Sequence, residues 1–164
     1  VRLMREASRG LAYLHKQGLV HRDIKPGNLL IDHDGHALVG DLGLLHETND
    51  PTSMTKELRE PEPNNTISRM LRNFVPGTVP YMRPEVLVGD EKDSSPTWDL
   101  YACGITLYQM LAGVRPPISD NPISYAKKPR SEGIPLLHQS NPKIPKTLDR
   151  IIQKCCAKEG GYEN

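Results

Sequence analysis

The chain has 164 residues, of which 37% are hydrophobic and 5% aromatic, enough for one globular domain of ordinary size. Its 21 Lys and Arg residues nearly balance 20 Asp and Glu residues, so bulk charge gives no case for binding nucleic acid or an anionic membrane. The longest mostly apolar stretch, 102–112, is too short to span a bilayer, and no signal peptide opens the chain. Three cysteines are too few for a disulfide framework, which favours an intracellular location, cytoplasmic or nuclear.

The first predicted elements are a helix over residues 1–18 and a short β-hairpin. In the helix, apolar residues recur at spacings of three and four and therefore share one face: Leu3, Met4, Ala7, Leu11 and Leu14. The hairpin is predicted from the apolar runs 29–31 and 37–39. The pair Asp34-Gly35 between these runs accepts the positive φ angles of a tight turn.

The middle of the chain is predicted to be irregular before a second long helix. Polar residues and prolines fill about 45–73, with a short helix around 66–73, and so long a loop in a domain is usually functional or disordered. Ser95 and Pro96 then fit the N-cap and first residue of a helix that ends near Ala112. Because this helix is apolar on nearly every side, we expect it to be buried all round.

The last third is predicted to be a proline-rich loop, 114–146, followed by an amphipathic helix over about 145–158. The expected apolar side of this helix consists of Leu148, Ile151, Ile152 and Cys155. Fifteen prolines, 13 glycines and a first residue that is Val rather than Met together suggest a fragment with long irregular segments.

Residues 21–30, His-Arg-Asp-Ile-Lys-Pro-Gly-Asn-Leu-Leu, concentrate groups that can act chemically. Asp23 and Lys25 are two residues apart, and alternate positions of an extended segment point the same way, so a carboxylate and an ammonium can face one site. Asn28 adds a neutral oxygen ligand, and the hairpin can bring the carboxylate of Asp41 close to it. A few oxygen ligands of this kind suit Mg²⁺ held jointly with phosphate oxygens, and the set matches phosphoryl transfer.

This segment resembles the catalytic loop of eukaryotic-type protein kinases. Five residues match that loop at fixed offsets: His21, Arg22, Asp23, Lys25 and Asn28. Three further family motifs follow in the right order, at 41–43, 77–85 and 99–104. The resemblance covers nearly the whole chain, and it implies that residues 1–164 are a partial kinase domain. The implied fold is the mainly helical (α+β) C-terminal lobe, with a small β-hairpin carrying the metal ligands and an activation segment over about 41–85.

The resemblance implies catalytic and ligand-binding roles for the matching residues. Asp23 would be the catalytic base that accepts or orients the proton of the substrate hydroxyl. Lys25 would neutralise the transferring phosphoryl group, and Thr78 would help to shape the hydroxyl site. Asn28 and Asp41 would bind Mg²⁺ and, together with Lys25, contact ATP.

The remaining matches imply supporting roles. Leu30 would contact the nucleotide, Arg22 would pair with a phosphorylated activation loop, and Asp99 would tie down the backbone of the catalytic loop. His21 would act by packing and hydrogen bonding. Gly43 belongs to the family motif that begins the activation segment, and Glu85 belongs to the one that ends it.

The chain departs from the family pattern at three places. No Gly-x-Gly-x-x-Gly loop or strand lysine precedes Asp23, and those parts cover and position the ATP phosphates. Leu42 replaces the usual Phe and Arg83 the usual Ala, and we expect both changes to be tolerated. The family's closing arginine is not visible after residue 156, so Glu85 is expected to lack its buried partner, which is costly for a charge.

The implied function is transfer of the ATP γ-phosphoryl group to Ser or Thr hydroxyls of protein substrates, with ATP and Mg²⁺ and with no nucleic acid or membrane span. The sequence motif Asp-x-Lys-Pro, with Gly-Thr downstream, resembles the motif of serine/threonine kinases rather than that of tyrosine kinases. We expect the parent protein to transfer phosphate and residues 1–164 alone not to do so. Phosphorylation between residues 52 and 78 would order the activation loop.

The alternative interpretation is a pseudokinase or a truncated binding module without catalysis. The intact set Asp23, Lys25, Asn28 and Asp41 favours an enzyme, because a scaffold has no physical need for that arrangement of charges.

Overall fold

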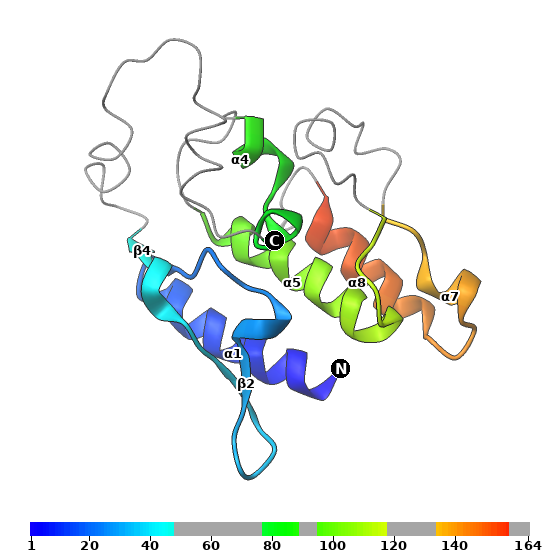
Figure 1. Cartoon of the computed structure of the whole chain (residues 1–164), viewed down its shortest axis with the longest axis horizontal. Helices are drawn as coiled ribbons and strands as arrows, with labels where there is room; N and C mark the ends of the chain where they lie inside the picture. The colour runs from blue at the N-terminus through cyan, green and yellow to red at the C-terminus, as the bar shows by residue number, and fades with distance from the viewer. Residues whose placement is uncertain (48–76, 89–94, 118–133, 158–164) are drawn as a thin grey trace.

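A computed structural model describes residues 1–47, 77–88, 95–117 and 134–157 of the chain (Figure 1). The helices are α1 (Arg2–Lys16), α4 (Pro84–Val88), α5 (Pro96–Ala112), α7 (Leu137–Ser140) and α8 (Lys146–Cys156). The strands are β1 (Leu19–Val20), β2 (Leu29–Ile31), β3 (Ala37–Val39) and β4 (His46–Glu47). Short 3₁₀ turns lie at Pro26–Asn28, Leu42–Leu44 and Val79–Tyr81. The predicted helix at 66–73 and the predicted phosphorylation sites at 52–76 lie outside the described residues.

Helix α1 confirms the first predicted element, with an end two residues earlier than expected. Its buried side chains are Met4, Ala7 and Leu11, the face that the spacing indicated. Gly18, with φ of 73°, takes the left-handed conformation that ends the helix cheaply and turns the chain into β1. Strand β1 pairs antiparallel with β4, and β4 corrects the expectation that the chain is irregular from about residue 45.

The predicted hairpin is confirmed as β2 and β3, which pair antiparallel with Leu29 opposite Val39 and Ile31 opposite Ala37. At its tip the Asp32 side chain accepts hydrogen bonds from the backbone amides of Asp34 and His36 at 3.0 and 2.8 Å. Gly35 supplies the positive φ of 78° that the turn requires.

The hairpin is fastened to the first turns of α1. Glu6 Oε2 accepts a hydrogen bond from the Ala37 amide at 2.9 Å, and Arg2 donates to the Gly35 carbonyl at 2.8 Å. The backbone hydrogen bond from Ala37 lowers the pKa of Glu6 and outweighs the effect of its partial desolvation. Helix and hairpin therefore form one structural unit.

Helix α5 runs through the centre of the described structure and is buried on nearly every side, as predicted (Figure 1). Every residue from Trp98 to Tyr108 except Leu100 is buried. Gly113, with φ of 75°, ends the helix, and its amide bonds to the Gln109 carbonyl. Ser95 occupies the N-cap position and Pro96 begins the helix, as predicted, and the Ser95 hydroxyl lies against that of Thr97.

Helix α8 packs against α5 at Gly104, where a Cβ atom would lie 2.6 Å from Cys156 Sγ and 2.8 Å from Cys155 Cβ. Gly104→Ala is therefore expected to lower the free energy of unfolding by about 1–3 kcal/mol, although alanine is the better helix former. Urea unfolding measures the change. Gly10→Ala in α1 is the matched control, because its new Cβ meets only Val39 at 3.6 Å. Equal effects of the two substitutions would contradict the close approach of α5 and α8.

Two details of the C-terminal part correct the sequence analysis. Ile151 is 50% exposed and does not belong to the buried side of α8, whereas Ile152 is buried as predicted and Leu148 and Cys155 are partly buried against the core. The buried side also includes Asp149 and Cys156. The predicted loop 114–146 contains the short helix α7, which the apolar pattern did not indicate. Asp149, which the apolar pattern did not include, is buried on α8 and contacts α7.

Asp149 caps α7. Its Oδ1 accepts a hydrogen bond from the Leu137 amide at 2.7 Å, and its Oδ2 accepts from the His138 amide and the His138 ring. Burial raises the pKa of Asp149, but these hydrogen bonds outweigh burial and hold the pKa below its ordinary value. A carboxyl with a lowered folded-state pKa stabilises the fold above its unfolded-state pKa, and this stabilisation is lost as the pH falls through the folded-state value.

Asp149→Asn is accordingly expected to destabilise the domain at pH 7, with the difference from wild type shrinking as the pH drops below about 4. Urea unfolding at pH 7 and at pH 3 measures both differences. A difference that is the same at both pH values would show that the ionised carboxylate contributes nothing.

Candidate active site

The first turn of α5 fixes the backbone of the loop that follows β1 through two hydrogen bonds. The fully buried Asp99 accepts hydrogen bonds from two consecutive backbone amides, Oδ2 from His21 at 2.9 Å and Oδ1 from Arg22 at 2.8 Å. Arg22 has φ of 70°, a conformation that a residue other than glycine rarely adopts. Such a backbone persists only where its surroundings fix it, and the two bonds to Asp99 provide that restraint.

The side chain of Asp23 is buried, and its two oxygens have different surroundings. Oδ2 accepts hydrogen bonds from Lys25 Nζ at 2.7 Å and from Asn28 Nδ2 at 2.9 Å. Oδ1 is buried and has no hydrogen-bond partner among the described residues. Leaving a buried acceptor unsatisfied costs about 1–3 kcal/mol, which is typical of a functional group rather than a structural one.

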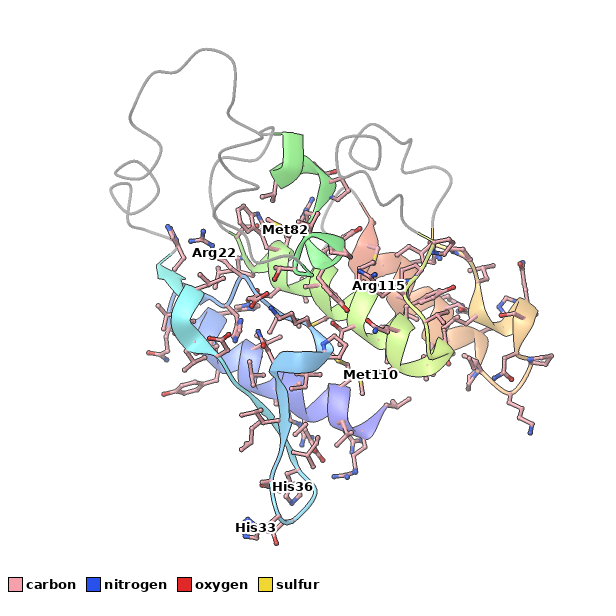
Figure 2. The ribbon with its side chains drawn as sticks, viewed as in Figure 1. Arg22, His33, His36, Met82, Met110 and Arg115 are labelled. Atoms are coloured by element: carbon pink, nitrogen blue, oxygen red, sulfur yellow. The ribbon has the colours of Figure 1, made fainter. Side chains whose placement is uncertain are left out.

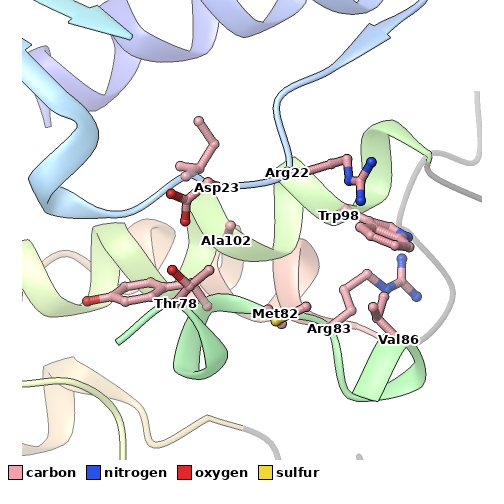
Figure 3. Close-up of a pocket in the computed structure, with 10 residues that line it drawn as sticks. Arg22, Asp23, Thr78, Met82, Arg83, Val86, Trp98 and Ala102 are labelled. Carbon is pink, nitrogen blue, oxygen red and sulfur yellow. The ribbon is translucent and has the colours of Figure 1, made fainter. Parts of the chain in front are cut away.

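Thr78 comes to this carboxylate from the distant segment 77–83. Lys25 Nζ donates to Thr78 Oγ1 at 3.0 Å as well as to Asp23, so the three side chains form one cluster. Figure 3 shows Asp23 and Thr78 facing each other across a small pocket. The buried Tyr81 is another of the residues that line this pocket. The structure thus brings together the three residues that the sequence predicted as catalytic.

Asn28 and the residue before Asp41 lie side by side because the hairpin closes between them. The Gly40 amide donates to the Asn28 carbonyl at 2.8 Å, and His21 Nε2 donates to the Gly40 carbonyl at 3.0 Å. The Asp23 amide donates to His21 Nδ1, which leaves the ring proton on Nε2 for that bond. The exposed Asp41 follows at once, with φ of 58°.

Two glycines near Asp41 lie close to neighbouring side chains. A Cβ on Gly43 would lie 3.3 Å from Asp41 Oδ1, and one on Gly40 would lie 2.7 Å from a methyl group of Leu30. Leu30 itself is 53% exposed on the outer face of β2. In the described part of the chain, no three His, Cys, Asp or Glu side chains gather closely enough to hold a metal ion by themselves.

Glu85 does not lack a partner, which corrects the sequence analysis. Arg83 Nε lies 3.5 Å from Glu85 Oε2, and both side chains are mostly buried. The residue that replaces the usual Ala therefore supplies the positive charge that was expected to be missing. Figure 3 shows Trp98 between Arg83 and Arg22, and the Arg22 guanidinium lies 5.7 Å from the centre of the Trp98 ring.

Sequence reasoning missed two side chains that contact this site. His15 Nε2 lies 2.7 Å from Asp99 Oδ2, and Tyr81 donates its hydroxyl proton to Gln109 Oε1. A signal for His15 was present, because it follows the buried Leu11 by four residues and so lies on the core-facing side of α1. No comparable pattern indicated the Tyr81–Gln109 bond, which joins segments 28 residues apart.

Comparison with known proteins places this chain in a family. The family model described as the protein kinase domain matches residues 1–160. The chain belongs to the protein kinase family. Kinases of this family use ATP and a divalent metal generally, and they phosphorylate proteins. Among the described residues, no helix has both the length and the apolar character that crossing a bilayer requires.

Bacterial and animal kinases are among the relatives. The chain is 32% identical over 161 residues to a probable serine/threonine-protein kinase of Clostridium acetobutylicum, a match that covers 97% of the chain and 22% of the relative. It is 32% identical to serine/threonine-protein kinase PrkC of Bacillus subtilis, over 96% of the chain and 22% of the relative. It is 40% identical to G protein-coupled receptor kinase 2 of Drosophila melanogaster, over 68% of the chain and 13% of the relative. The chain therefore spans about a fifth of the length of the first two relatives.

Proposed function

We propose that the protein carrying this chain transfers the γ-phosphoryl group of ATP to serine or threonine hydroxyls of protein substrates. The observation that carries the proposal is the asymmetry of Asp23. Lys25 and Asn28 fix one oxygen of its carboxylate, and the other oxygen is a buried acceptor without a partner among the described residues. A substrate hydroxyl is a donor that would satisfy it, and a positioned carboxylate can then take the proton.

The reaction conserves atoms and charge in a simple way. The substrate oxygen forms a bond to Pγ, the bond between Pγ and the β,γ-bridging oxygen breaks, and ADP leaves. The hydroxyl proton passes to Asp23 Oδ1. Lys25 Nζ lies against both Asp23 and Thr78, so its positive charge is available to the transferring group and to the hydroxyl site together.

Asn28 and Asp41 fit the divalent cation that the family uses. Asn28 Nδ2 donates to the Asp23 carbonyl at 2.7 Å and to the Asp23 carboxylate, which fixes the amide orientation and leaves Oδ1 as an oxygen ligand. Asp41 adds an exposed carboxylate close by in the chain fold. Mg²⁺ held by few protein oxygens and by phosphate would neutralise charge on the phosphates.

The described residues correspond, in this proposal, to the C-terminal lobe of a kinase, with the activation segment at about 41–85. The exposed side of the hairpin supports it, because Leu30 and the opposite residue Leu38 are each about half exposed and offer an apolar surface to a nucleotide base. Residues 1–164 alone are proposed to be inactive, and the parent protein to act inside the cell, in the cytoplasm or the nucleus.

The test is phosphate transfer from labelled ATP by the full-length protein to peptides that differ only in carrying Ser, Thr, Tyr or Ala at one position. We expect transfer to Ser and Thr peptides, none to the Ala peptide, and loss of transfer when EDTA removes the divalent cation. Residues 1–164 assayed alone should give no transfer. Absence of transfer by the full-length protein would favour a pseudokinase, and transfer to the Tyr peptide alone would contradict the assignment of substrate class.

A further inference from the structure

The loop that carries Asp23 depends on a contact from a helix that does not belong to the catalytic motifs. Near the C-terminal end of α1, His15 Nε2 lies 2.7 Å from Asp99 Oδ2. This is the same oxygen that accepts the His21 amide at 2.9 Å. Asp99 is fully buried, and the His15 side chain is 17% exposed. The contact joins residues 84 positions apart in the chain.

Asp99 can hold two consecutive amides only in one orientation. Its Oδ1 must point to the Arg22 amide while its Oδ2 points to the His21 amide. A carboxylate group turns about its last side-chain bond, and this torsion has broad minima rather than sharp ones. A third donor, placed by a different element, removes this freedom. His15 is that donor, because a carboxylate oxygen only accepts and the ring nitrogen facing it must carry the proton.

The orientation matters because the held backbone is strained. Arg22 has φ of 70°, and it directly precedes Asp23. A change in the angle at Arg22 would rotate the following residue and move Asp23 Oδ1, whose position relative to Lys25 and Thr78 defines the site. Preorganised catalytic groups require supporting hydrogen bonds that keep them within about half an ångström of the productive geometry.

We infer that His15 is a positioning residue for phosphoryl transfer, acting through Asp99 on the backbone at residues 21 and 22. The inference rests on the proposed function for its catalytic consequence, but its structural part stands on the contacts alone. His15 contacts Asp99, which holds the backbone before Asp23, so we expect its effect to fall on the chemical step and not on the binding of either substrate.

Two substitutions of His15 separate the effect of its hydrogen bond from the effect of its ring. His15→Phe keeps a planar ring of similar shape and removes the donor, whereas His15→Gln loses the ring and keeps an N–H near the position of Nε2. His33→Phe is the matched control, because it makes the same chemical change at the exposed hairpin tip (Figure 2). Should His15→Phe fail to fold, His15→Asn replaces it, since its shorter side chain withdraws the donor from Asp99.

The experiment measures kcat, the two KM values and amide hydrogen exchange on the full-length protein. In His15→Phe we expect kcat to fall about tenfold, as for loss of one hydrogen bond to a charged group, with both KM values within about twofold of wild type. Exchange of the His21 and Arg22 amides should accelerate, and His15→Gln should restore both properties.

Unchanged exchange at these two amides in His15→Phe would overturn the inference, whatever the activity. A His15→Gln variant that behaves like His15→Phe would also overturn it, because the ring rather than the hydrogen bond would then matter. If the wild-type protein transfers no phosphate, the proposed function fails, while the exchange measurement still decides whether His15 positions the loop.

Discussion

Asp23→Asn in the full-length kinase is expected to lower kcat for a Ser or Thr peptide by about 10²–10⁴-fold, with little change in the KM for ATP. The amide has nearly the shape of the carboxylate but cannot take the proton of the substrate hydroxyl. It also removes the negative partner of Lys25 at 2.7 Å and places a second amide opposite Asn28. Steady-state kinetics with labelled ATP measures the loss.

Asp34→Asn is the control for this substitution, because Asp34 is an exposed acid at the hairpin tip, away from the cluster around Lys25. It should leave kcat unchanged. Thermal unfolding of both variants shows whether the fold is retained. An Asp23→Asn enzyme that keeps its fold and retains more than about a tenth of the wild-type kcat would exclude Asp23 as the catalytic base.

Asp99→Ala is expected to destabilise the described structure strongly. It leaves the buried backbone amide of His21, the partly buried amide of Arg22 and the His15 ring without their acceptor. Each orphaned buried donor costs about 1–3 kcal/mol, so we expect a loss of about 3–5 kcal/mol in the free energy of unfolding. Urea unfolding followed by circular dichroism measures it.

The hairpin offers a matched control in Asp32→Ala. Asp32 also accepts two backbone amides, those of Asp34 and His36, but it does so at the solvent-accessible tip. Water can replace the lost acceptor there, so we expect a cost below about 1 kcal/mol. If the two aspartates proved equally costly to replace, burial would not be the reason that Asp99 matters, and its role in restraining the loop would have to be reconsidered.

Elements with a strong local pattern were predictable from the sequence. Helix α5 has no polar face, and the hairpin is marked by Asp34-Gly35 between two apolar runs, so period and turn chemistry were sufficient. The family was predictable for a different reason, because catalytic chemistry requires particular residue types at fixed spacing around Asp23. The matching model over residues 1–160 confirms that prediction.

What the sequence did not indicate depends on contacts between distant residues. Helix α7 exists because Asp149, at least nine residues further along, accepts its first amides, and no local pattern records that bond. The Arg83–Glu85 pair was missed because Arg83 was weighed as a substitute for Ala and not as a cation beside an acid. Ile151 was assigned to the core because it is apolar, yet the buried face of α8 includes the carboxylate of Asp149.

Helix α1 makes hydrogen bonds to other elements near both of its ends, and its length therefore fixes the distance between those elements. Arg2 and Glu6 bind the backbone of the hairpin near its tip. His15 contacts Asp99, which holds the loop that carries Asp23. Because an α-helix rises about 1.5 Å per residue, α1 keeps the contacts of Arg2 and His15 about 20 Å apart. A displacement of the hairpin would therefore be transmitted through α1 to the loop that carries Asp23. For the same reason, an insertion of one residue within α1 would shift the hairpin relative to that loop without altering any reactive group.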